Sequence, residues 1–538
     1  MPRVTMILLL GFVLTGCKLG GYVTGLEGSV TLQEEISGST LVIDKIGPFE
    51  FGRPYLPFAN FRVAVSEPSA SPDQECKVIN GEGTLYIDDF LNIQVSCKNS
   101  DTYIYNGPEP NIVIIFTDDQ GYQDLGVYGH PLIQTPNLDR MADDGIRFTS
   151  FYTGFHVCTA SRAALLTGCY PGRNSMGPDV IFDFDTWALH PEEVTIAEIL
   201  RDAGYATGMI GKWHLGHSET EFLPTSQGFD YYYGIPYSND MPNFLFPTPP
   251  YMRGEEIVEQ PIDQDLIIQR YTQESLQFIE DNKDKPFFLY LAHNMPHYPA
   301  HASDAFRGRS ASCDDAGLAY SCGLYADVIA EIDWSTGQIL NKLDELGLDE
   351  RTLVIFTSDN GPWQELLIYL PFLLQDPRPQ TGSADPLRGA KRSSWEGGFR
   401  VPAIMRWPGH IPAGQVSDAI VAAIDLFPTI ANLADAAMPT DRIIDGENIW
   451  PILSGQSDGS DHAPFYYDIG ALTFCSPGAI RQGQWKLRGD KLYNLSTDIH
   501  EDRDVADLYP HIKEELEQLY ADKLAEIEAG RRPYGGTK

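Results

Sequence analysis

The stretch Asn111-Ile-Val-Ile-Ile-Phe-Thr-Asp-Asp-Gln-Gly121 combines a nearly all-apolar run with two acidic residues and a glycine. Such a run is typical of a central parallel β-strand that helices cover on both faces. A second stretch, Leu353-Val-Ile-Phe-Thr-Ser-Asp-Asn-Gly361, repeats the same order of features. In an open α/β sheet, ligands bind beyond the carboxyl ends of the strands. The repeat therefore predicts a site at the ends of two strands that lie near each other.

Around these two strands, helical patterns alternate with further apolar runs. The alternation runs through residues 194–203, 207–210, 271–282, 287–291 and 324–346. It predicts an α/β fold for residues 111–436, with a mostly parallel central sheet flanked by helices. In residues 437–538, short strand candidates precede a charged helix from His511 to Glu528. We expect a small C-terminal α+β subdomain there.

Residues 20–98 differ from the rest of the chain. They contain short alternating runs such as Thr40-Leu-Val-Ile43, Phe61-Arg-Val-Ala-Val65 and Thr84-Leu-Tyr-Ile87, with turn residues between them. This pattern predicts a small antiparallel module that resembles a β-sandwich, followed by a polar linker at 99–110. No residues with site chemistry stand out in the module, so a spacer is a better interpretation than a carbohydrate-binding domain.

Residues 1–17 are expected to be a lipoprotein signal peptide. Arg3 precedes an apolar run from Met6 to Leu14 that is too short to span a bilayer as a mature helix. The sequence Leu14-Thr-Gly-Cys17 resembles a bacterial lipobox, which implies cleavage before Cys17 and a lipid on its thiol. An ordinary signal peptide with a chance cysteine is the alternative. We expect an exported protein that is anchored in a bacterial membrane, the outer one, and faces the periplasm or the cell surface.

The chain is strongly acidic, with 75 Asp and Glu residues against 38 Lys and Arg residues and a net charge of −37. Such a surface repels nucleic acid, which we exclude as a partner. It would also repel an anionic substrate, so an enzyme for anions must gather positive charge locally, in a cation or a few basic side chains.

The eight cysteines suit an exported protein with disulfides. Two pairs bracket short segments, namely Cys76 with Cys97 and Cys313 with Cys322. Cys169 and Cys475 could pair or stay free.

The acidic strand ends predict a metal site. Asp118, Asp119, Asp359 and Asn360 would bring three carboxylates and one amide together, and these would repel one another without a cation. Oxygen ligands of this kind suit a hard cation, and we expect one ion, Ca²⁺ rather than Mg²⁺. The alternative is that Asp and Gly simply form turns after strands.

The segment His156-Val-Cys-Thr-Ala-Ser-Arg-Ala-Ala-Leu-Leu-Thr-Gly168 is the most specific in the chain. Strong helix formers follow Cys158, and Gly168 is a natural helix stop. Cys158 is therefore expected at a helix N-terminus, where backbone N–H groups favour anions, with Arg162 one turn later on the same face. From these residues alone, Cys158 is a reactive thiolate candidate, and a buried structural cysteine is the alternative.

This segment resembles the signature of the sulfatases, an arylsulfatase-like family of the alkaline phosphatase superfamily. Cys169 stands at a position where many members of this family carry arginine. Further stretches resemble family motifs in the family's order: Asn111–Gly121, Thr135-Pro-Asn-Leu-Asp139, Gly211-Lys-Trp-His-Leu-Gly216, Gly234-Ile-Pro-Tyr-Ser238, Pro296-His-Tyr-Pro299, Thr357–Gly361, Leu387-Arg-Gly-Ala-Lys391 and Trp395-Glu-Gly-Gly-Phe-Arg-Val-Pro402. The resemblance covers residues from about 110 to the C-terminus.

The resemblance implies roles for particular residues. A maturation enzyme would oxidise Cys158 to formylglycine, whose hydrate attacks the sulfur of a sulfate ester, and an oxygen at position 158 would complete the ligand set of Asp118, Asp119, Asp359 and Asn360. It also implies basic and polar groups that bind the sulfate, hold the hydrate or move protons: Arg162, Lys212, His214, Ser238, His297 and Lys391. Each of these has a structural alternative, such as a surface, turn or loop residue.

We therefore expect a sulfatase that hydrolyses an aryl sulfate or a sulfated carbohydrate. One alternative is a formylglycine-dependent phosphodiesterase or phosphonate monoester hydrolase. Another is a non-catalytic, lipid-anchored glycan-binding protein. Specificity is expected to lie in the loops 237–251 and 363–385, and the latter carries Trp363.

Overall fold

The structure is a computed structural model that describes residues 17–24, 26, 28–45, 47–56, 59–67, 74–79, 81–85, 90–99, 105, 107–177, 180–241, 249–317, 321–364, 380–459, 462–468 and 477–537. The chain forms two compact units, Met1–Ile104 and Tyr105–Lys538. Cys475, and most of the residues 1–17 assigned to the signal peptide, lie outside the described residues.

The first unit is all-β, as predicted. It holds two four-stranded sheets, ordered β4-β1-β8-β6 and β3-β2-β5-β7. The strands are β1 (Leu19–Thr24), β2 (Val30–Glu34), β3 (Ser39–Ile43), β4 (Gly47–Glu50), β5 (Asn60–Glu67), β6 (Gln74–Ile79), β7 (Glu82–Thr84) and β8 (Phe90–Asn99). Side chains from both sheets, including Leu19, Leu32 and Val95, share one buried apolar cluster.

One detail of this unit differs from the expectation. The module is not wholly antiparallel, because β1 and β8 pair in parallel. β7 pairs with β5 through Glu82, Gly83 and Thr84, and Tyr86 and Ile87 of the strand expected at Thr84-Leu-Tyr-Ile87 lie outside the described residues. Cys76 is disulfide-bonded and stands directly opposite Cys97 in the β6–β8 register.

The second unit is built on a ten-stranded mixed sheet, ordered β16-β15-β14-β13-β17-β9-β18-β19-β10-β20. The strands are β9 (Asn111–Thr117), β10 (Ile146–Phe148), β13 (Ala206–Lys212), β14 (Tyr231–Ile235), β15 (Tyr251–Arg253), β16 (Glu256–Glu259), β17 (Phe287–Ala292), β18 (Thr352–Ser358), β19 (Ala403–Arg406) and β20 (Gln415–Ser417). The central neighbours β14, β13, β17, β9 and β18 pair in parallel, which confirms the predicted parallel core. Antiparallel strands extend it on both sides.

Strand β9 shows why an uninterrupted apolar run is needed at the centre. Its alternate residues Ile112, Ile114 and Phe116 pack into one buried cluster, and Val113 and Ile115 pack into another on the opposite face. Because helices cover both faces, every position of the strand is buried. Full burial of each such side chain contributes about 1.5–3 kcal/mol.

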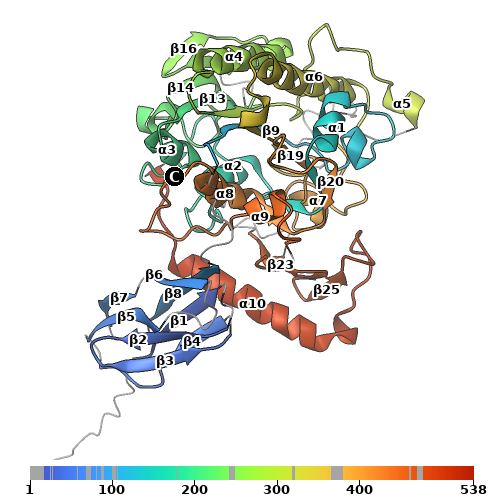
Figure 1. Ribbon diagram of the computed structural model, residues 1–538. Coiled ribbons are helices and arrows are strands. Elements are labelled where there is room, and N and C mark those ends of the chain that lie inside the picture. The colour runs from blue at the N-terminus through green and yellow to red at the C-terminus, as the bar shows by residue number, and fades with distance from the viewer. Residues whose placement is uncertain are drawn as a thin grey trace, which may run out of the picture. The chain divides into compact units, whose positions relative to one another are not determined.

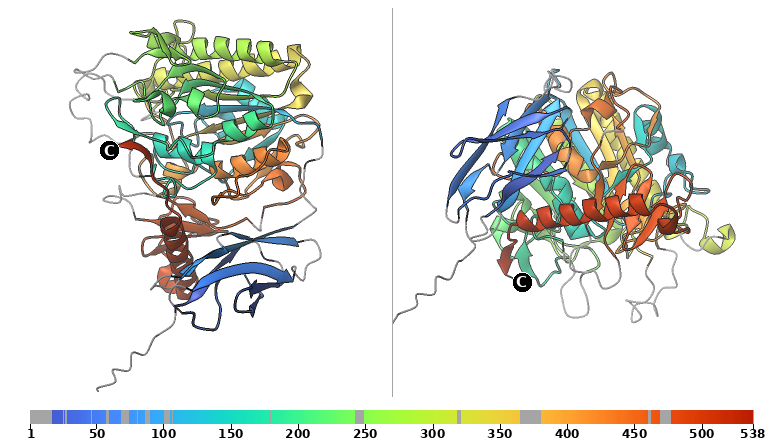
Figure 2. Two further views of the ribbon diagram at one scale, coloured as in Figure 1. Left: turned by 90° about the vertical axis from the view of Figure 1, so that its left-hand side faces the viewer. Right: turned by 90° about the horizontal axis from the view of Figure 1, so that it is seen from below.

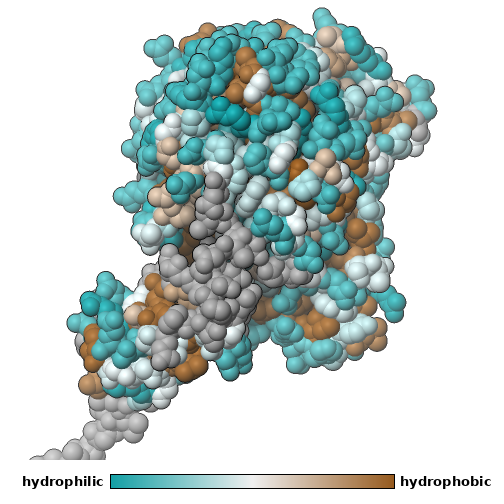
Figure 3. All heavy atoms as spheres, viewed as in Figure 1, coloured by the Kyte–Doolittle hydropathy of each residue, from teal (hydrophilic) through white to brown (hydrophobic). Residues whose placement is uncertain are grey.

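The helices form one layer on each side of the sheet (Figures 1 and 2). The first cluster includes residues of α2 (Cys158–Thr167), α3 (Ile196–Asp202) and α8 (Leu426–Leu433). The second includes residues of α1 (Pro136–Asp143), α4 (Ile267–Asn282) and α6 (Leu324–Glu345). Figure 3 shows mostly hydrophilic side chains on the outer face above α4 and α6.

Shorter elements complete the unit. These are α5 (Cys313–Ala316), α7 (Glu396–Phe399), α9 (Trp450–Leu453), the pair β11 (Phe151–Tyr152) and β21 (Val421–Ala422), and the pair β12 (Thr186–Ala188) and β26 (Gly535–Thr537). A disulfide joins Cys313 to Cys322, as expected for this pair. Cys169 is a free, buried thiol. In the described part of the chain, no helix is long and apolar enough to cross a membrane.

The C-terminal part is the expected α+β subdomain. An antiparallel sheet of β22 (Phe465–Tyr467), β23 (Ala479–Gln482), β24 (Trp485–Arg488) and β25 (Lys491–Asn494) precedes α10 (Pro510–Ala529). Buried ion pairs join this part to the rest of the unit. Lys486 donates to Glu396 over 2.8 Å, and Arg173 pairs with Asp445 over 2.6 Å, all four side chains being fully buried.

Candidate active site

The acidic ends of β9 and β18 meet at one edge of the sheet. The two strands are hydrogen-bonded neighbours in register up to Thr117 and Ser358. Just beyond, the Asp119 N–H donates to Asp359 Oδ1 over 3.1 Å, and Asn360 Nδ2 donates to Asp119 Oδ1 over 2.6 Å. The repeated strand pattern therefore places its acidic and amide side chains in direct contact.

Three oxygens of this group suit a metal ion. Asp118 Oδ1, Asp119 Oδ2 and Asn360 Oδ1 are buried, and each lacks a hydrogen-bond donor among the described residues. A buried oxygen without a partner is costly, and a hard cation satisfies several such oxygens at once. The residues present thus fit Ca²⁺ or Mg²⁺.

Four residues bring potential ligand atoms close together. The ligand atoms of Asp118, Asp119, Cys158 and His297 all lie within 4.8 Å of one another. His297 belongs to this group, although sequence reasoning gave it a different role. Asp359 lies beside the group, where its two oxygens accept hydrogen bonds from the Asp119 amide and from Arg162, and its role as a ligand stays a prediction. Burial and the neighbouring Asp118 carboxylate raise the pKa of Asp359 to about 7.

Cys158 is the first residue of α2, and its side chain is buried. The preceding Val157 is extended and caps no amide with its side chain, and Gly168 ends the helix in the left-handed conformation at φ 66°. The first-turn N–H groups of this helix are therefore open to an anion. Arg162, one turn along, donates to Asp359 Oδ2 over 2.8 Å and to the Lys212 carbonyl over 3.0 Å.

Two lysines bring positive charge into this site. Lys212 Nζ lies 2.5 Å from Asp118 Oδ2 and 3.2 Å from Ser238 Oγ. Lys391 Nζ lies 2.6 Å from Asp119 Oδ1 and 3.3 Å from Cys158 Sγ. Burial alone would raise the pKa of Asp118, but Lys212 and the other nearby cations outweigh burial and hold that pKa well below its usual range.

Two histidines differ in charge. His214 is held at φ 61°, and its Nε2 donates to the Ile181 carbonyl over 2.9 Å. Burial and Lys212 lower the pKa of His214, so the ring is neutral at pH 7, and its buried Nδ1 has no hydrogen-bond partner among the described residues. Burial would also lower the pKa of His297, but Asp119 and Asp240 raise it to about 9.

All the residues predicted for the site lie in this cluster or touch it. Of the other histidines nearby, His301 pairs instead with Asp265 over 2.8 Å, and His293 is fully buried. Sequence reasoning missed Asp240, whose charge acts on His297. Its position two residues after Ser238, in the same motif, was an available signal. Trp363 was expected in a specificity loop, and its ring lies 5.0 Å from Lys391 Nζ, centroid to atom; residues 242–248 and 365–379 of the two loops are outside the described residues.

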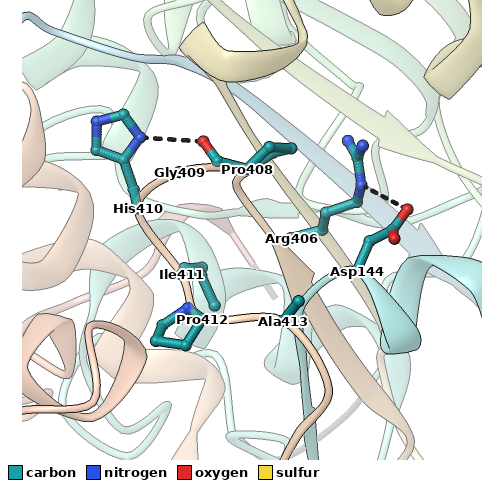
Figure 4. Close-up of a pocket in the computed structure, with 8 residues that line it drawn as sticks. All are labelled: Asp144, Arg406, Pro408, Gly409, His410, Ile411, Pro412 and Ala413. Carbon is teal, nitrogen blue, oxygen red and sulfur yellow. Dashed lines mark hydrogen bonds and ion pairs between the residues drawn. The ribbon is translucent and has the colours of Figure 1, made fainter.

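A surface hollow lies away from the candidate active site. It is lined by Asp144, Arg406 and residues 408–413 (Figure 4). Arg406 pairs in register with Val354, which is at the opposite end of β18 from Asp359. Figure 4 shows an ion pair between Arg406 and Asp144 and a hydrogen bond between His410 and the Pro408 carbonyl in the hollow. This hollow therefore plays no part in the candidate site.

The central strands of the sheet are parallel, and their ends bring together acidic residues, cationic residues and a cysteine at a helix N-terminus. This arrangement is that of an enzyme of the alkaline phosphatase-like class. The family model described as Sulfatase matches residues 110–436, and one described as N-sulphoglucosamine sulphohydrolase, C-terminal, matches residues 389–526. The chain belongs to the sulfatase family and is a sulfuric ester hydrolase.

Relatives and solved structures agree with this assignment. Human arylsulfatase A is 39% identical over 398 residues, which cover 70% of this chain and 74% of the relative. Mouse N-acetylgalactosamine-6-sulfatase is 38% identical over 436 residues, covering 76% and 79%. The crystal structure of Ps i-CgsB in complex with k-i-k-neocarrahexaose matches with a TM-score of 0.65 and 29% identity, covering 77% of this chain and 93% of that one. These matches favour neither the phosphodiesterase nor the non-catalytic alternative.

Proposed function

We propose that this sulfatase hydrolyses the sulfate ester of a carbohydrate, with Cys158 converted to formylglycine and one Ca²⁺ ion bound at the strand ends. The observation that carries the proposal is a set of three buried oxygens, on Asp118, Asp119 and Asn360, that have no hydrogen-bond partner among the described residues and lie beside a helix-terminal cysteine. The carbohydrate is supported by the relative named N-acetylgalactosamine-6-sulfatase and by the solved structure of a complex with k-i-k-neocarrahexaose. Conversion of Cys158 requires a formylglycine-generating maturation enzyme as a partner.

Asp118, Asp119, Asp359, Asn360 and residue 158 would hold the ion, with Arg162 beside them. When bound, the ion supplies positive charge for the ester oxygens, and the hydrated aldehyde supplies the nucleophile. The lysines Lys212 and Lys391 neutralise the sulfate oxygens, and Ser238 holds Lys212 in place.

His297 and His214 can carry out the two proton transfers of the reaction. His297 is charged at neutral pH, so it can protonate the leaving oxygen. His214 is neutral, and its Nδ1 carries a free lone pair that can accept a proton. The two rings therefore have the opposite charge states that an acid and a base need.

Rates on matched aryl sulfate and aryl phosphate esters test the reaction class. We expect the matured enzyme to prefer the sulfate ester by a large factor in kcat/KM. A preference for the phosphate ester would contradict the proposal and favour the phosphodiesterase alternative.

Calcium should bind tightly and stabilise the fold. Because the ion satisfies three buried oxygens, we expect Ca²⁺ at one hundred times its Kd to raise the free energy of unfolding by about 2.7 kcal/mol. Calorimetric titration of chelator-treated protein measures binding, and denaturation with and without Ca²⁺ measures the stabilisation. Mg²⁺ should bind more weakly.

The matched variants are Asp118→Asn and Asp349→Asn. Asp349 pairs with Arg406 at the far end of β18, so its substitution should leave calcium binding unchanged. Asp118→Asn should weaken binding at least about ten-fold, as expected for loss of a charged ligand. Equal binding by both variants would place the ion elsewhere.

We further propose that the protein is exported and held in the outer membrane by a lipid on Cys17. The support is the sequence of residues 6–17. Cys17 is buried, and its backbone is hydrogen-bonded to that of Tyr55, so attachment of the lipid requires the thiol to become exposed. Mass spectrometry of the N-terminal peptide tests the proposal, and an unmodified Cys17 in membrane-free protein from the native host would contradict it.

A further inference from the structure

The segment Ile181–Asp185 is attached directly to the candidate active site. The Ile181 carbonyl accepts a hydrogen bond from His214 Nε2 over 2.9 Å. The Ile181 N–H donates to Thr159 Oγ1 over 3.1 Å, and Thr159 follows Cys158 in the chain. Hydrogen bonds with His214 and Thr159 therefore fix the backbone position of Ile181, from which the residues of the segment continue.

This segment is a firmly held turn. The Phe182 N–H donates to Asp185 Oδ2 over 2.7 Å, and the Asp185 N–H donates to the Phe182 carbonyl over 3.0 Å. The Asp183 carbonyl accepts a hydrogen bond from His217 Nε2 over 3.1 Å, and the His217 ring packs against Tyr237. With its backbone bonded on several sides, the turn needs little reorganisation to bind a ligand.

The turn presents two aromatic rings to solvent. Phe182 and Phe184 are 38% and 58% exposed. Their rings are stacked, with centroids 5.4 Å apart and planes only 3° from parallel. Burying such rings would stabilise the fold, so two of them exposed side by side at the edge of a site indicate a ligand surface.

The surroundings of the rings are acidic. Burial and the nearby Asp185 and Asp240 raise the pKa of Asp183. The same Asp240 raises the pKa of His297, so its charge acts both on the turn and on the cationic part of the site. In the described part of the chain, no lysine or arginine forms an ion pair with Asp183, Asp185 or Asp240. This rim would repel a second sulfate but can accept hydrogen bonds from hydroxyl groups.

We propose that Phe182 and Phe184 form a platform for an uncharged sugar ring, the one joined to the sulfated sugar of the substrate. The proposal rests on the proposed function and narrows its substrate to glycans that are unsulfated at this neighbouring ring. A pyranose has an apolar C–H face for the phenyl rings and hydroxyl groups for Asp183. An aryl leaving group would stack as well but would give the carboxylates no donor.

The double variant Phe182→Ala/Phe184→Ala tests the platform on two substrates. One is a monosulfated disaccharide with a neutral second ring, and the other is the corresponding sulfated monosaccharide. Loss of two stacking contacts should lower kcat/KM for the disaccharide about ten-fold, and the monosaccharide should change less than about two-fold. Tyr509→Ala is the matched control, since Tyr509 is also 38% exposed and belongs to a different part of the fold.

The variant Asp183→Asn tests the charge of the rim. Asparagine keeps an acceptor oxygen but removes the repulsion, so the rate on a disaccharide sulfated on both rings should rise several-fold relative to the monosulfated disaccharide. An unchanged ratio would overturn the assignment of an uncharged ring.

The outcomes separate the two proposals. If the unchanged enzyme hydrolyses no sulfated sugar, the proposed carbohydrate function fails. If the unchanged enzyme does hydrolyse a sulfated sugar, but the double variant loses activity equally on both substrates or on neither, the platform proposal is overturned and the carbohydrate function stands. A selective loss on aryl sulfates would also overturn the sugar platform.

Discussion

Replacing Cys158 by alanine should lower kcat for any sulfate ester by about 10⁴-fold or more, because the reaction loses its nucleophile. The side chain is the first of α2, lies 3.3 Å from Lys391 Nζ and shares its surroundings with Asp118 and Asp119. No other cysteine in the described part of the chain lies in this cluster. Initial rates on an aryl sulfate, at matched protein concentration and with calcium present, measure the effect.

The matched control is Cys169→Ala. Cys169 is also a buried free thiol and lies just beyond the other end of α2, where its Sγ donates to the Ile443 carbonyl over 3.1 Å. Its removal should leave kcat within about two-fold, as expected for a small side chain outside the site. Mass spectrometry of position 158 in active protein should find the aldehyde. Substantial activity in Cys158→Ala, or unmodified cysteine in fully active protein, would contradict the assignment.

The second large effect concerns stability. Asp445→Ala should lower the free energy of unfolding by about 3–5 kcal/mol, because Arg173 and Lys523 lose the fully buried carboxylate that they share, and only Glu526 remains beside them. Asp445 accepts hydrogen bonds from Arg173 Nε over 2.8 Å, from the Tyr170 N–H over 2.9 Å and from Lys523 over 2.9 Å. Denaturant unfolding, followed by far-UV circular dichroism, measures the change.

A surface pair close in sequence is the control. Asp441 is 66% exposed in its ion pair with Arg442, so Asp441→Ala should cost only about 0–1 kcal/mol. The buried pair should also respond to pH. Although burial would raise the pKa of Asp445, the charge of Arg173 holds it below the usual value, so the stabilisation is present above about pH 4 and is lost as pH falls further. Similar costs for both variants would contradict this account.

Much of the fold and of the site could be predicted from local pattern. The apolar run of β9 and its repeat in β18 fixed two neighbouring parallel strands, because only a strand buried on both faces is apolar at every position. Parallel strands direct their carboxyl ends to one edge, so Asp118, Asp119, Asp359 and Asn360 were expected together. The position of Cys158 followed from helix propensity and from Gly168.

Local sequence pattern could not predict contacts between residues that are far apart in the sequence. Lys391 lies 233 residues from Cys158, and Lys212 lies 94 residues from Asp118. Their positions depend on the packing of whole elements, and only the resemblance of motifs pointed to them. The sequence did not point to the Phe182–Asp185 turn, because its proposed role depends on the exposure and stacking of the two phenylalanine rings.

The buried pairs that join the C-terminal sheet and helix to the rest of the second unit bear on how this enzyme can be divided. The Sulfatase match ends at residue 436, yet Arg173 and Glu396 before that point find their partners Asp445 and Lys486 after it. A protein shortened to the matched region would leave buried Arg173 without Asp445 and Glu526, and buried Glu396 without Lys486. Gene fusions, domain exchanges and truncations should therefore keep everything from Tyr105 to the last helix intact.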